Sequence, residues 1–226
     1  MAADLERRFG GLGGHFVVPA DDIASRLRRT RALVFDWDGV FNAGVKGGGA
    51  ASGFSEPDSM GTNMLRFALW RERGVQPICA LVSGADNPGA REFANREHFH
   101  DAFCGIRDKS AAFATLLGAH RLSFDEVAYV FDDINDLGVA RSCGLRVLVR
   151  REASPLLADH VVERALCEYV TGREASQYAV REVCELLIGT LDQYDAVVTA
   201  RSAVDADYAR FFAERQRIAT EIHDAG

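Results

Sequence analysis

Short apolar runs alternate with helical patterns through the middle of this 226-residue chain. The apolar runs cover residues 32–35, 78–82, 102–104, 127–131 and 145–149, and the helical patterns cover 59–73, 87–97, 109–119 and 134–143. The apolar runs are nearly continuous in Val, Ile, Leu, Phe and Ala, which is typical of strands that helices cover on both faces. The order of the elements predicts an α/β protein with a doubly wound, Rossmann-like parallel sheet.

The flanking segments predict additions to one central domain. We expect an N-terminal extension with a helix over residues 1–30, a central domain over 31–190, and a helical C-terminal extension over 191–226. The cluster of glycines at residues 10–14 follows no apolar run, so we interpret it as a flexible terminus rather than a phosphate-binding loop. Residues 41–55 are rich in glycine and predict a hairpin or flap, and further helices are expected over 178–191 and 204–223.

Composition excludes several classes of protein. The formal net charge is −7, from 26 Lys and Arg against 33 Asp and Glu, which argues against a nucleic-acid partner because phosphate backbones attract clustered cations. No apolar run approaches the roughly 18–20 residues needed to cross a bilayer, and the N-terminal residues lack the apolar core of a secretion signal. We expect a cytoplasmic protein without membrane contact. The five cysteines are scattered and predict buried apolar side chains rather than disulfides.

The most informative motif is Asp36-Trp37-Asp38-Gly39, which follows directly on the first apolar run. Side chains at i and i+2 of a strand share one face, so both carboxylates project from the carboxyl end of the strand. Ligands bind at that edge of an open α/β sheet. Two carboxylates about 4 Å apart repel by ~4 kcal/mol at an effective dielectric of 20. Such a pair persists if a cation or a proton bridges it, or if one carboxylate turns into solvent.

Three further strand ends carry polar groups. Asp132, Asp133 and Asp136 follow the run at 127–131, Ser83 and Gly84 follow the run at 78–82, and Lys109 begins a helix after the run at 102–104. Each group alone has an ordinary structural explanation as a helix cap, a turn or a surface charge. Their occurrence together at neighbouring strand ends predicts one site. The excess of carboxylates over Lys109 favours Mg²⁺, which binds one or two carboxylates together with a substrate phosphate.

These residues resemble the four motifs of the haloacid dehalogenase-like (HAD) phosphatase superfamily. The resemblance implies that Asp36 is the nucleophile, that Asp38 is the general acid and base, and that Ser83, Gly84 and Lys109 bind the phosphoryl group. It implies Mg²⁺ on the Asp36 carboxylate, the Asp38 backbone carbonyl and Asp132. Asp133 would act through water, and Asp136 would contact the ligands without binding the metal directly.

A closer similarity is to the capless branch typified by 3-deoxy-D-manno-octulosonate 8-phosphate phosphatase. It rests on the glycine-rich segment that ends at Phe54, on Asp58 and Gly61, on residues 155–157 and on residues 179–184. The intervals 38–83 and 109–127 leave no room for a cap domain. This branch implies a Mg²⁺-dependent phosphatase acting on a small phosphate ester, such as a sugar-acid phosphate, through an aspartyl-phosphate. It also implies a homo-oligomer, by resemblance a tetramer, whose subunits cover each other's sites.

Two alternatives stay open from the sequence. Ala85 stands where the branch has Arg and Phe131 where it has Gly, which is compatible with a catalytically reduced HAD-like scaffold that binds a ligand or partner as an oligomer. A response-regulator receiver uses similar residue types, but there the paired Asp residues come first in the chain. Arg173 and Arg181 are candidates to bind a substrate carboxylate, although surface or helix-dipole roles are expected for both. His98 and His100 are more compatible with surface positions than with a metal site.

Overall fold

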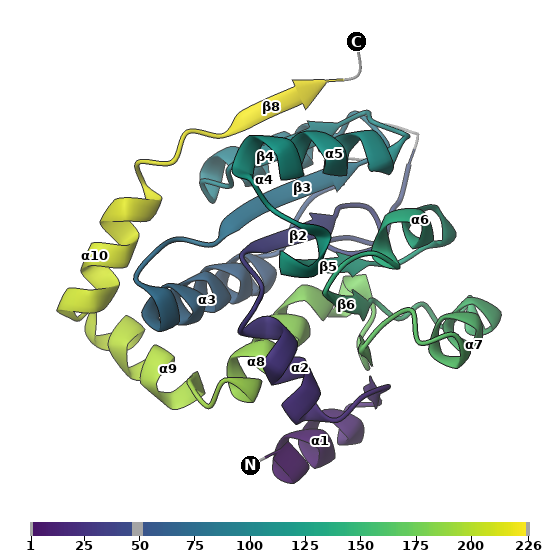
Figure 1. Ribbon diagram of the computed structural model, residues 1–226, viewed down its shortest axis with the longest axis horizontal. Helices are drawn as coiled ribbons and strands as arrows, with labels where there is room; N and C mark the ends of the chain where they lie inside the picture. The colour runs from purple at the N-terminus through teal and green to yellow at the C-terminus, as the bar shows by residue number, and fades with distance from the viewer. Residues whose placement is uncertain (1, 47–51, 225–226) are drawn as a thin grey trace.

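A computed structural model describes residues 2–46 and 52–224, and within them eight strands form a single sheet (Figure 1). The strands are β1 (His15–Phe16), β2 (Ala32–Asp36), β3 (Ile78–Ser83), β4 (Asp101–Cys104), β5 (Val127–Phe131), β6 (Leu145–Leu148), β7 (Tyr169–Val170) and β8 (Glu221–Asp224). Their order across the sheet is β1-β7-β6-β5-β2-β3-β4-β8, and every pair is parallel except β1 with β7. The predicted α/β fold with a mostly parallel sheet is confirmed.

Ten α-helices connect these strands within the described residues. They are α1 (Ala2–Gly11), α2 (Ala20–Leu27), α3 (Glu56–Arg73), α4 (Pro88–Arg96), α5 (Lys109–His120), α6 (Leu137–Ala140), α7 (Pro155–Glu163), α8 (Ala179–Thr190), α9 (Tyr194–Ala203) and α10 (Ala206–Arg215). None of the described helices has both the length and the apolar character needed to cross a membrane.

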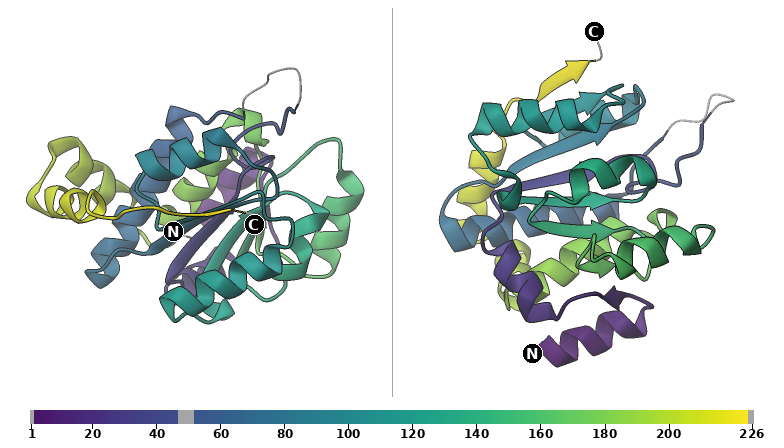
Figure 2. Two further views of the ribbon diagram at one scale, coloured as in Figure 1. Left: turned by 90° about the horizontal axis from the view of Figure 1, so that it is seen from above. Right: turned by 45° about the vertical axis from the view of Figure 1, so that its right-hand side comes forward.

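The core has two layers because alternate residues of each strand face opposite sides of the sheet. Leu33 and Phe35 of β2 pack with α2, α3, α4 and α8 on one face. Val34, between them, packs with α5, α6 and α7 on the other face. Helices thus cover both faces of the sheet (Figure 2), which explains why the central strands read as continuous apolar runs.

Helix α3 shows how local sequence sets an element. The side chain of Ser55 accepts a hydrogen bond from the backbone N–H of Asp58, so it caps the start of the helix. Gly74 ends the helix with φ of +72°, a left-handed conformation that favours glycine. The predicted helix over 59–73 therefore begins three residues earlier than expected, at Glu56.

Both ends of the chain differ from the prediction. Of the glycine cluster at 10–14, interpreted as a flexible terminus, Gly10 and Gly11 end helix α1, which buries Phe9 in the same core as α2 and α8. The charged stretch 204–223 is not one helix: α10 ends at Arg215, and Glu221–Asp224 forms β8 beside β4. The segment 191–226, expected to be helical, thus also supplies a strand to the sheet.

Two internal predictions are also corrected. The helix expected over 134–143 is a 3-10 turn (Ile134–Asp136) followed by the short α6. The hairpin expected over 41–55 has no strand in its described residues, 41–46 and 52–55, where one isolated bridge joins Asp38 and Asn42. The rest of that segment, 47–51, lies outside the described residues. The five cysteines are all buried and free, as predicted.

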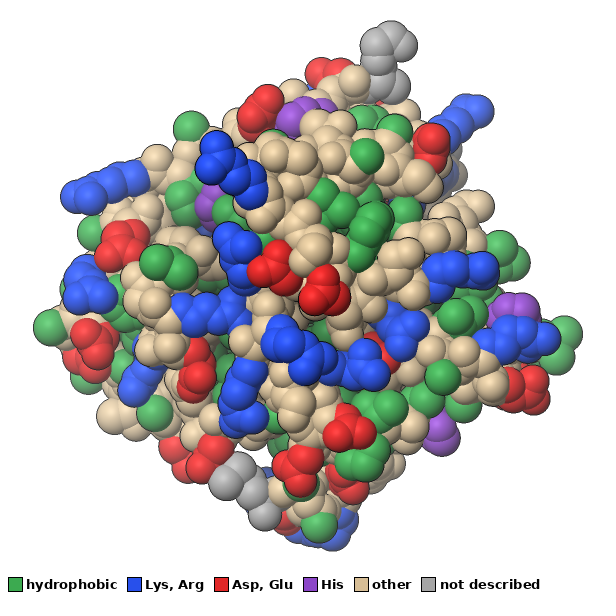
Figure 3. Space-filling model, in the orientation of Figure 1, with side chains coloured by type: hydrophobic (Ala, Val, Ile, Leu, Met, Phe, Trp, Pro, Cys, Tyr) green, Lys and Arg blue, Asp and Glu red, His purple; other side chains and the backbone are tan. Residues whose placement is uncertain are grey.

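Charges of both signs share the surface despite the net charge of −7. On the face shown in Figure 3, Lys and Arg side chains gather near the middle with acidic groups among them. The acidic balance of the whole chain is therefore not a uniform acidic surface.

Candidate active site

The predicted motif residues meet at the carboxyl edge of the sheet. β2 lies between β3 and β5, so Asp36 at the end of β2 is close to Ser83 at the end of β3 and to Asp132 after β5. Lys109, the first residue of α5, approaches from the face that α5 covers. The tertiary structure thus brings together groups from four separate strand ends, as parallel topology requires.

Lys109 is the central cation of this group. Its Nζ lies 2.7 Å from Oδ1 of Asp36 and also pairs with Asp136, and all three side chains are buried. The Tyr129 hydroxyl donates a hydrogen bond to Asp136. Burial by itself lowers the pKa of Lys109, but Asp36 and Asp136 raise it, so the net pKa is above its usual range. Lys109 therefore remains a fixed positive charge beside Asp36.

Asp36, Asp132 and Asp136 each place a carboxylate oxygen within 4.8 Å of the others. Burial raises the pKa of Asp36 to about 6, with Lys109 opposing the shift. Burial, together with the charge of Asp36, raises the pKa of Asp132 to about 8, although the Arg151 guanidinium pairs with Asp132 and lowers it. The ionised forms are costly because these side chains are buried and their like charges lie close together.

Asp38 is held beside Asp36 by two donors on one of its oxygens. Its Oδ2 accepts a hydrogen bond of 2.7 Å from the Asn87 side-chain amide and lies 2.8 Å from Nζ of Lys46. Its Oδ1 is buried and has no hydrogen-bond partner. Such an orphaned acceptor is costly unless a ligand or a proton satisfies it. The free oxygen is thus available to a reacting group.

Ser83 and Gly39 lie next to these carboxylates in fixed conformations. The Ser83 hydroxyl donates to the backbone carbonyl of Ala85 at 2.9 Å and accepts from the Asn87 amide at 3.1 Å. Gly39 has φ of +87°, and a Cβ there would lie 1.9 Å from a carboxylate oxygen of Asp132. Only glycine therefore allows the chain to turn after Asp38 while Asp132 approaches it.

The site contains a cavity of about 700 Å³, within the size range of small-molecule sites. Asp36, Asp38, Gly84, Lys109, Asp132, Asp133 and Asp136 line it together with Lys46, Arg107 and Arg151. The last three, and Asn87, were not predicted as site residues. A signal existed for Lys46, because the chain has only two lysines, Lys46 and Lys109, and both line this cavity.

Several candidate residues make contacts other than those expected from the sequence. Asp133 is half-buried and caps the turn after β5, with Oδ1 accepting from the backbone N–H of Ile134, so Asp136 and not Asp133 joins the three-carboxylate group. Arg181 pairs with Glu185, and neither Arg173 nor Arg181 lines the cavity. His98 and His100 are not surface side chains: both are partly buried, and Nδ1 of His100 accepts from the backbone N–H of Cys79.

The residues at this edge suit a hard divalent cation. The donors are oxygens only, three of the carboxylates are buried and close enough to share one ion, and the orphaned oxygen of Asp38 lies in the same cavity. Mg²⁺ prefers such ligands and keeps several waters. Asp36 and Asp132 are the residues best placed to hold it, with Asp136 and Lys109 behind them.

The chain is similar in sequence to phosphatases of one type. No family model matches the chain. It is 31% identical over 179 residues to the 3-deoxy-D-manno-octulosonate 8-phosphate phosphatase KdsC of Escherichia coli (strain K12), covering 76% of this chain and 88% of that protein. It is 29% identical over 180 residues to KdsC of Yersinia pestis, covering 78% of this chain and 89% of that protein.

Solved structures show the same fold. The crystal structure of the Yersinia pestis phosphatase superposes with a TM-score of 0.65 at 28% identity, covering 77% of this chain and 89% of that chain. A phosphatase of this type from Moraxella catarrhalis, solved in complex with magnesium, phosphate and KDO, gives a TM-score of 0.65 at 23% identity, covering 80% and 98%. The chain therefore belongs to the KdsC-type 3-deoxy-D-manno-octulosonate 8-phosphate phosphatase family of the HAD superfamily, a family of phosphoric monoester hydrolases.

Proposed function

We propose that this chain is a Mg²⁺-dependent phosphatase that hydrolyses a sugar-acid phosphate, such as 3-deoxy-D-manno-octulosonate 8-phosphate, through an aspartyl-phosphate on Asp36. The observation that carries the proposal is the pairing of a buried Asp36 with a permanently charged Lys109, beside the carboxylates of Asp132 and Asp136. The names of the relatives support the choice of substrate.

Asp36 supplies the nucleophile. An oxygen of its carboxylate forms a bond to phosphorus while the bond from phosphorus to the substrate's alcohol oxygen breaks. Lys109, 2.7 Å from Oδ1 of Asp36, lowers the cost of keeping this carboxylate ionised and approaches the phosphoryl oxygens from the same side. A bound Mg²⁺ would add positive charge where the phosphoryl oxygens gather.

Asp38 supplies the proton transfers. Protonated Asp38 donates its proton to the leaving alcohol and then takes one from the water that hydrolyses the aspartyl-phosphate, which frees the Asp36 carboxylate and leaves Asp38 protonated again. Asn87 and Lys46 hold one oxygen of Asp38, so the unpartnered Oδ1 is free for these transfers. We expect the Gly84 backbone, which lines the cavity, and the Ser83 hydroxyl beside it to bind the phosphoryl oxygens.

The charges of the cavity support a substrate with more than one anionic group. Five carboxylates line it, together with four cations: Lys46, Arg107, Lys109 and Arg151. A divalent cation would turn the formal balance of the cavity positive by one unit. A sugar acid that carries both a phosphate and a carboxylate suits this balance, with Arg107 and Lys46 as the proposed carboxylate partners.

Ala43, Gly44 and Lys46 line one part of the cavity, and no cap domain covers it within the described residues. We therefore expect a homo-oligomer, a tetramer by family resemblance, in which a neighbouring subunit covers the site. Light scattering coupled to size-exclusion chromatography measures this state.

The experiment that tests the function is a phosphate-release assay on a panel of sugar phosphates that includes 3-deoxy-D-manno-octulosonate 8-phosphate. We expect turnover with Mg²⁺, loss of turnover with EDTA, and a raised KM for the sugar-acid ester in Arg107→Ala. Turnover of simple sugar phosphates at equal kcat/KM would contradict the substrate class. No turnover of any ester would favour the alternative of a ligand-binding scaffold.

A further inference from the structure

A second group of metal-binding side chains lies at the other end of the sheet, where β8 pairs with β4. We propose that Asp101, Glu221 and His223 bind a zinc-type divalent ion that fixes β8 to the edge of the sheet. This site is independent of the proposed catalytic reaction.

Strand pairing explains how the three side chains meet. In the parallel register, Asp101 lies opposite Glu221 and Phe103 lies opposite His223. Residues at i and i+2 share one face, so Glu221 and His223 both project on the side of the sheet that carries Asp101. The His223 ring stacks on Phe103 with centroids 4.2 Å apart, and this contact fixes the direction of the imidazole.

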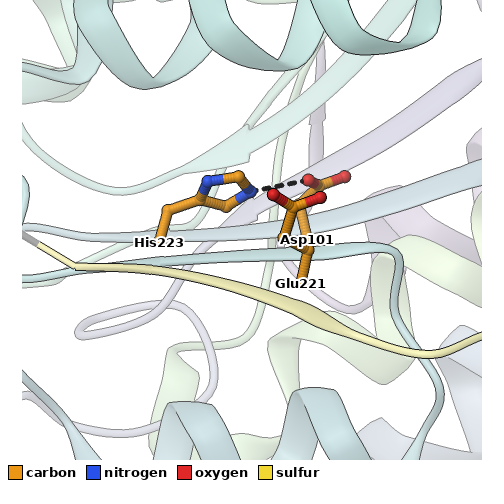
Figure 4. A group of neighbouring side chains, drawn as sticks. All are labelled: Asp101, Glu221 and His223. Atoms are coloured by element: carbon orange, nitrogen blue, oxygen red, sulfur yellow. Dashed lines mark hydrogen bonds and ion pairs between the residues drawn. The ribbon is translucent and has the colours of Figure 1, made fainter.

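The potential ligand atoms are close together. Nε2 of His223 lies 2.8 Å from Oδ1 of Asp101, and the carboxylate of Glu221 turns toward the same point (Figure 4). One atom from each of the three residues lies within 4.8 Å of the others. Ligands of a single Zn²⁺ at about 2.0–2.2 Å each need only small side-chain movements from this arrangement.

The other oxygen of Asp101 is already oriented. Oδ2 lies 2.7 Å from Nε2 of His120, the last residue of α5. Asp101 is almost fully buried, at 2% exposure, whereas Glu221 is exposed. A ligating carboxylate is commonly held in this way by a hydrogen bond on its second oxygen. Asp101 is thus a buried ligand whose orientation is fixed. Because Glu221 is exposed, water could complete the coordination of the ion on its side.

The donor set differs from that of the catalytic cavity. An imidazole nitrogen with two carboxylates favours Zn²⁺, Co²⁺ or Ni²⁺ over Mg²⁺, whereas the all-oxygen catalytic group favours Mg²⁺. The two carboxylates also balance the charge of the ion when His223 is neutral. The chemistry therefore assigns a different metal to each end of the fold.

The consequence for the protein is structural. β8 has four residues and lies at the edge of the sheet after the connection from α10, so few backbone hydrogen bonds hold it. An ion shared by β4 and β8 would join the C-terminal segment to the sheet. Zinc should then protect the end of the chain from proteolysis.

The test measures zinc bound to the metal-stripped full chain by equilibrium dialysis with excess Mg²⁺, which occupies the catalytic carboxylates. We expect one zinc per chain in the wild type. Glu221→Gln preserves the hydrogen bonds of Asp101 and should weaken zinc affinity by about 10–100-fold. His223→Ala should abolish this binding and remove the protection of the C-terminus by zinc.

Two variants serve as controls. Asp224→Asn changes the neighbouring residue of β8, whose side chain pairs with Arg91 instead, and should bind zinc like the wild type. Asp132→Asn alters the catalytic carboxylates and should also keep the zinc. The proposal is overturned if Asp132→Asn loses the zinc, or if Glu221→Gln and His223→Ala both bind it like the wild type. Asp101, His120 and His223 would then form only a hydrogen-bonded group.

Discussion

The catalytic cavity and the group of Asp101, Glu221 and His223 (the β4–β8 cluster) each contain a buried aspartate, but the partners of the two aspartates differ. Asp36 has Lys109 as a partner that stays charged at all physiological pH values, whereas Asp101 lies between the imidazoles of His120 and His223. The cavity combines five carboxylates with four cations, which leaves one net negative charge for a metal ion, and the metal would let a phosphate approach. The cluster has enough donors for one ion. An excess of unsatisfied charge therefore marks the region suited to chemistry.

Replacing the proposed nucleophile should give the largest difference in activity between substitutions in the two regions. Asp36→Asn should lower kcat for phosphate release by about 10⁴-fold or more, because an amide cannot form the aspartyl-phosphate. The matched Asp224→Asn, an exposed carboxylate on β8, should stay within about twofold of the wild type. Circular dichroism verifies that both variants are folded. Turnover by Asp36→Asn near the wild-type rate would refute the mechanism.

Removing the cation of the cavity should cost stability. Lys109→Gln leaves Asp36 and Asp136 buried without their partner, which should lower the free energy of unfolding by about 3 kcal/mol at pH 8. Urea denaturation measures the change. Lys46→Gln is the matched control: its side chain is 56% exposed, so its pairing with Asp38 should contribute less than about 1 kcal/mol. Equal losses in the two variants would mean that burial is not what distinguishes these lysines.

The hydrogen bond to Asp38 should have a smaller effect on rate. Asn87→Ala removes a donor to Asp38 and one to Ser83, and we expect about a 10-fold decrease in kcat with little change in KM. Asn95→Ala, on the same helix but bonded to its own backbone, is the control. A change in KM alone would instead assign Asn87 to substrate binding.

The smallest expected effect concerns pH. Because the pKa values of Asp36 and Asp132 are raised to about 6 and 8, their ionised forms destabilise the metal-free fold. This destabilisation is greatest above pH 8 and is relieved as the pH falls through these values. Mg²⁺ should therefore raise the Tm more at pH 8 than at pH 5.5, by about 2–4 °C. An equal or larger gain at pH 5.5, measured by calorimetry, would contradict the raised pKa values.

The convergence of Asp36, Ser83, Lys109 and Asp132 could be predicted because it depends on topology alone. Parallel strands that alternate with helices place their carboxyl ends on one edge, whatever the details of packing. The close approach of Asp136 to Asp36 and Asp132 could not be predicted, because it depends on a single 3-10 turn after β5. Arg107, Arg151 and Asn87 were missed for a similar reason. Arg107 and Arg151 reach the cavity from loops, and Asn87 contacts Asp38 from the start of α4, and no local pattern reveals this geometry.

The β4–β8 cluster could not be predicted from a single sequence. Asp101 and His223 are separated by 121 residues, and β8 lies in a stretch whose composition favoured a helix. By itself, the order of apolar runs and acidic strand ends determined the class of fold, the edge that carries the candidate site and the chemistry it resembles. Only the tertiary structure decided which charges pair, because burial and strand register act between residues that are distant in the chain.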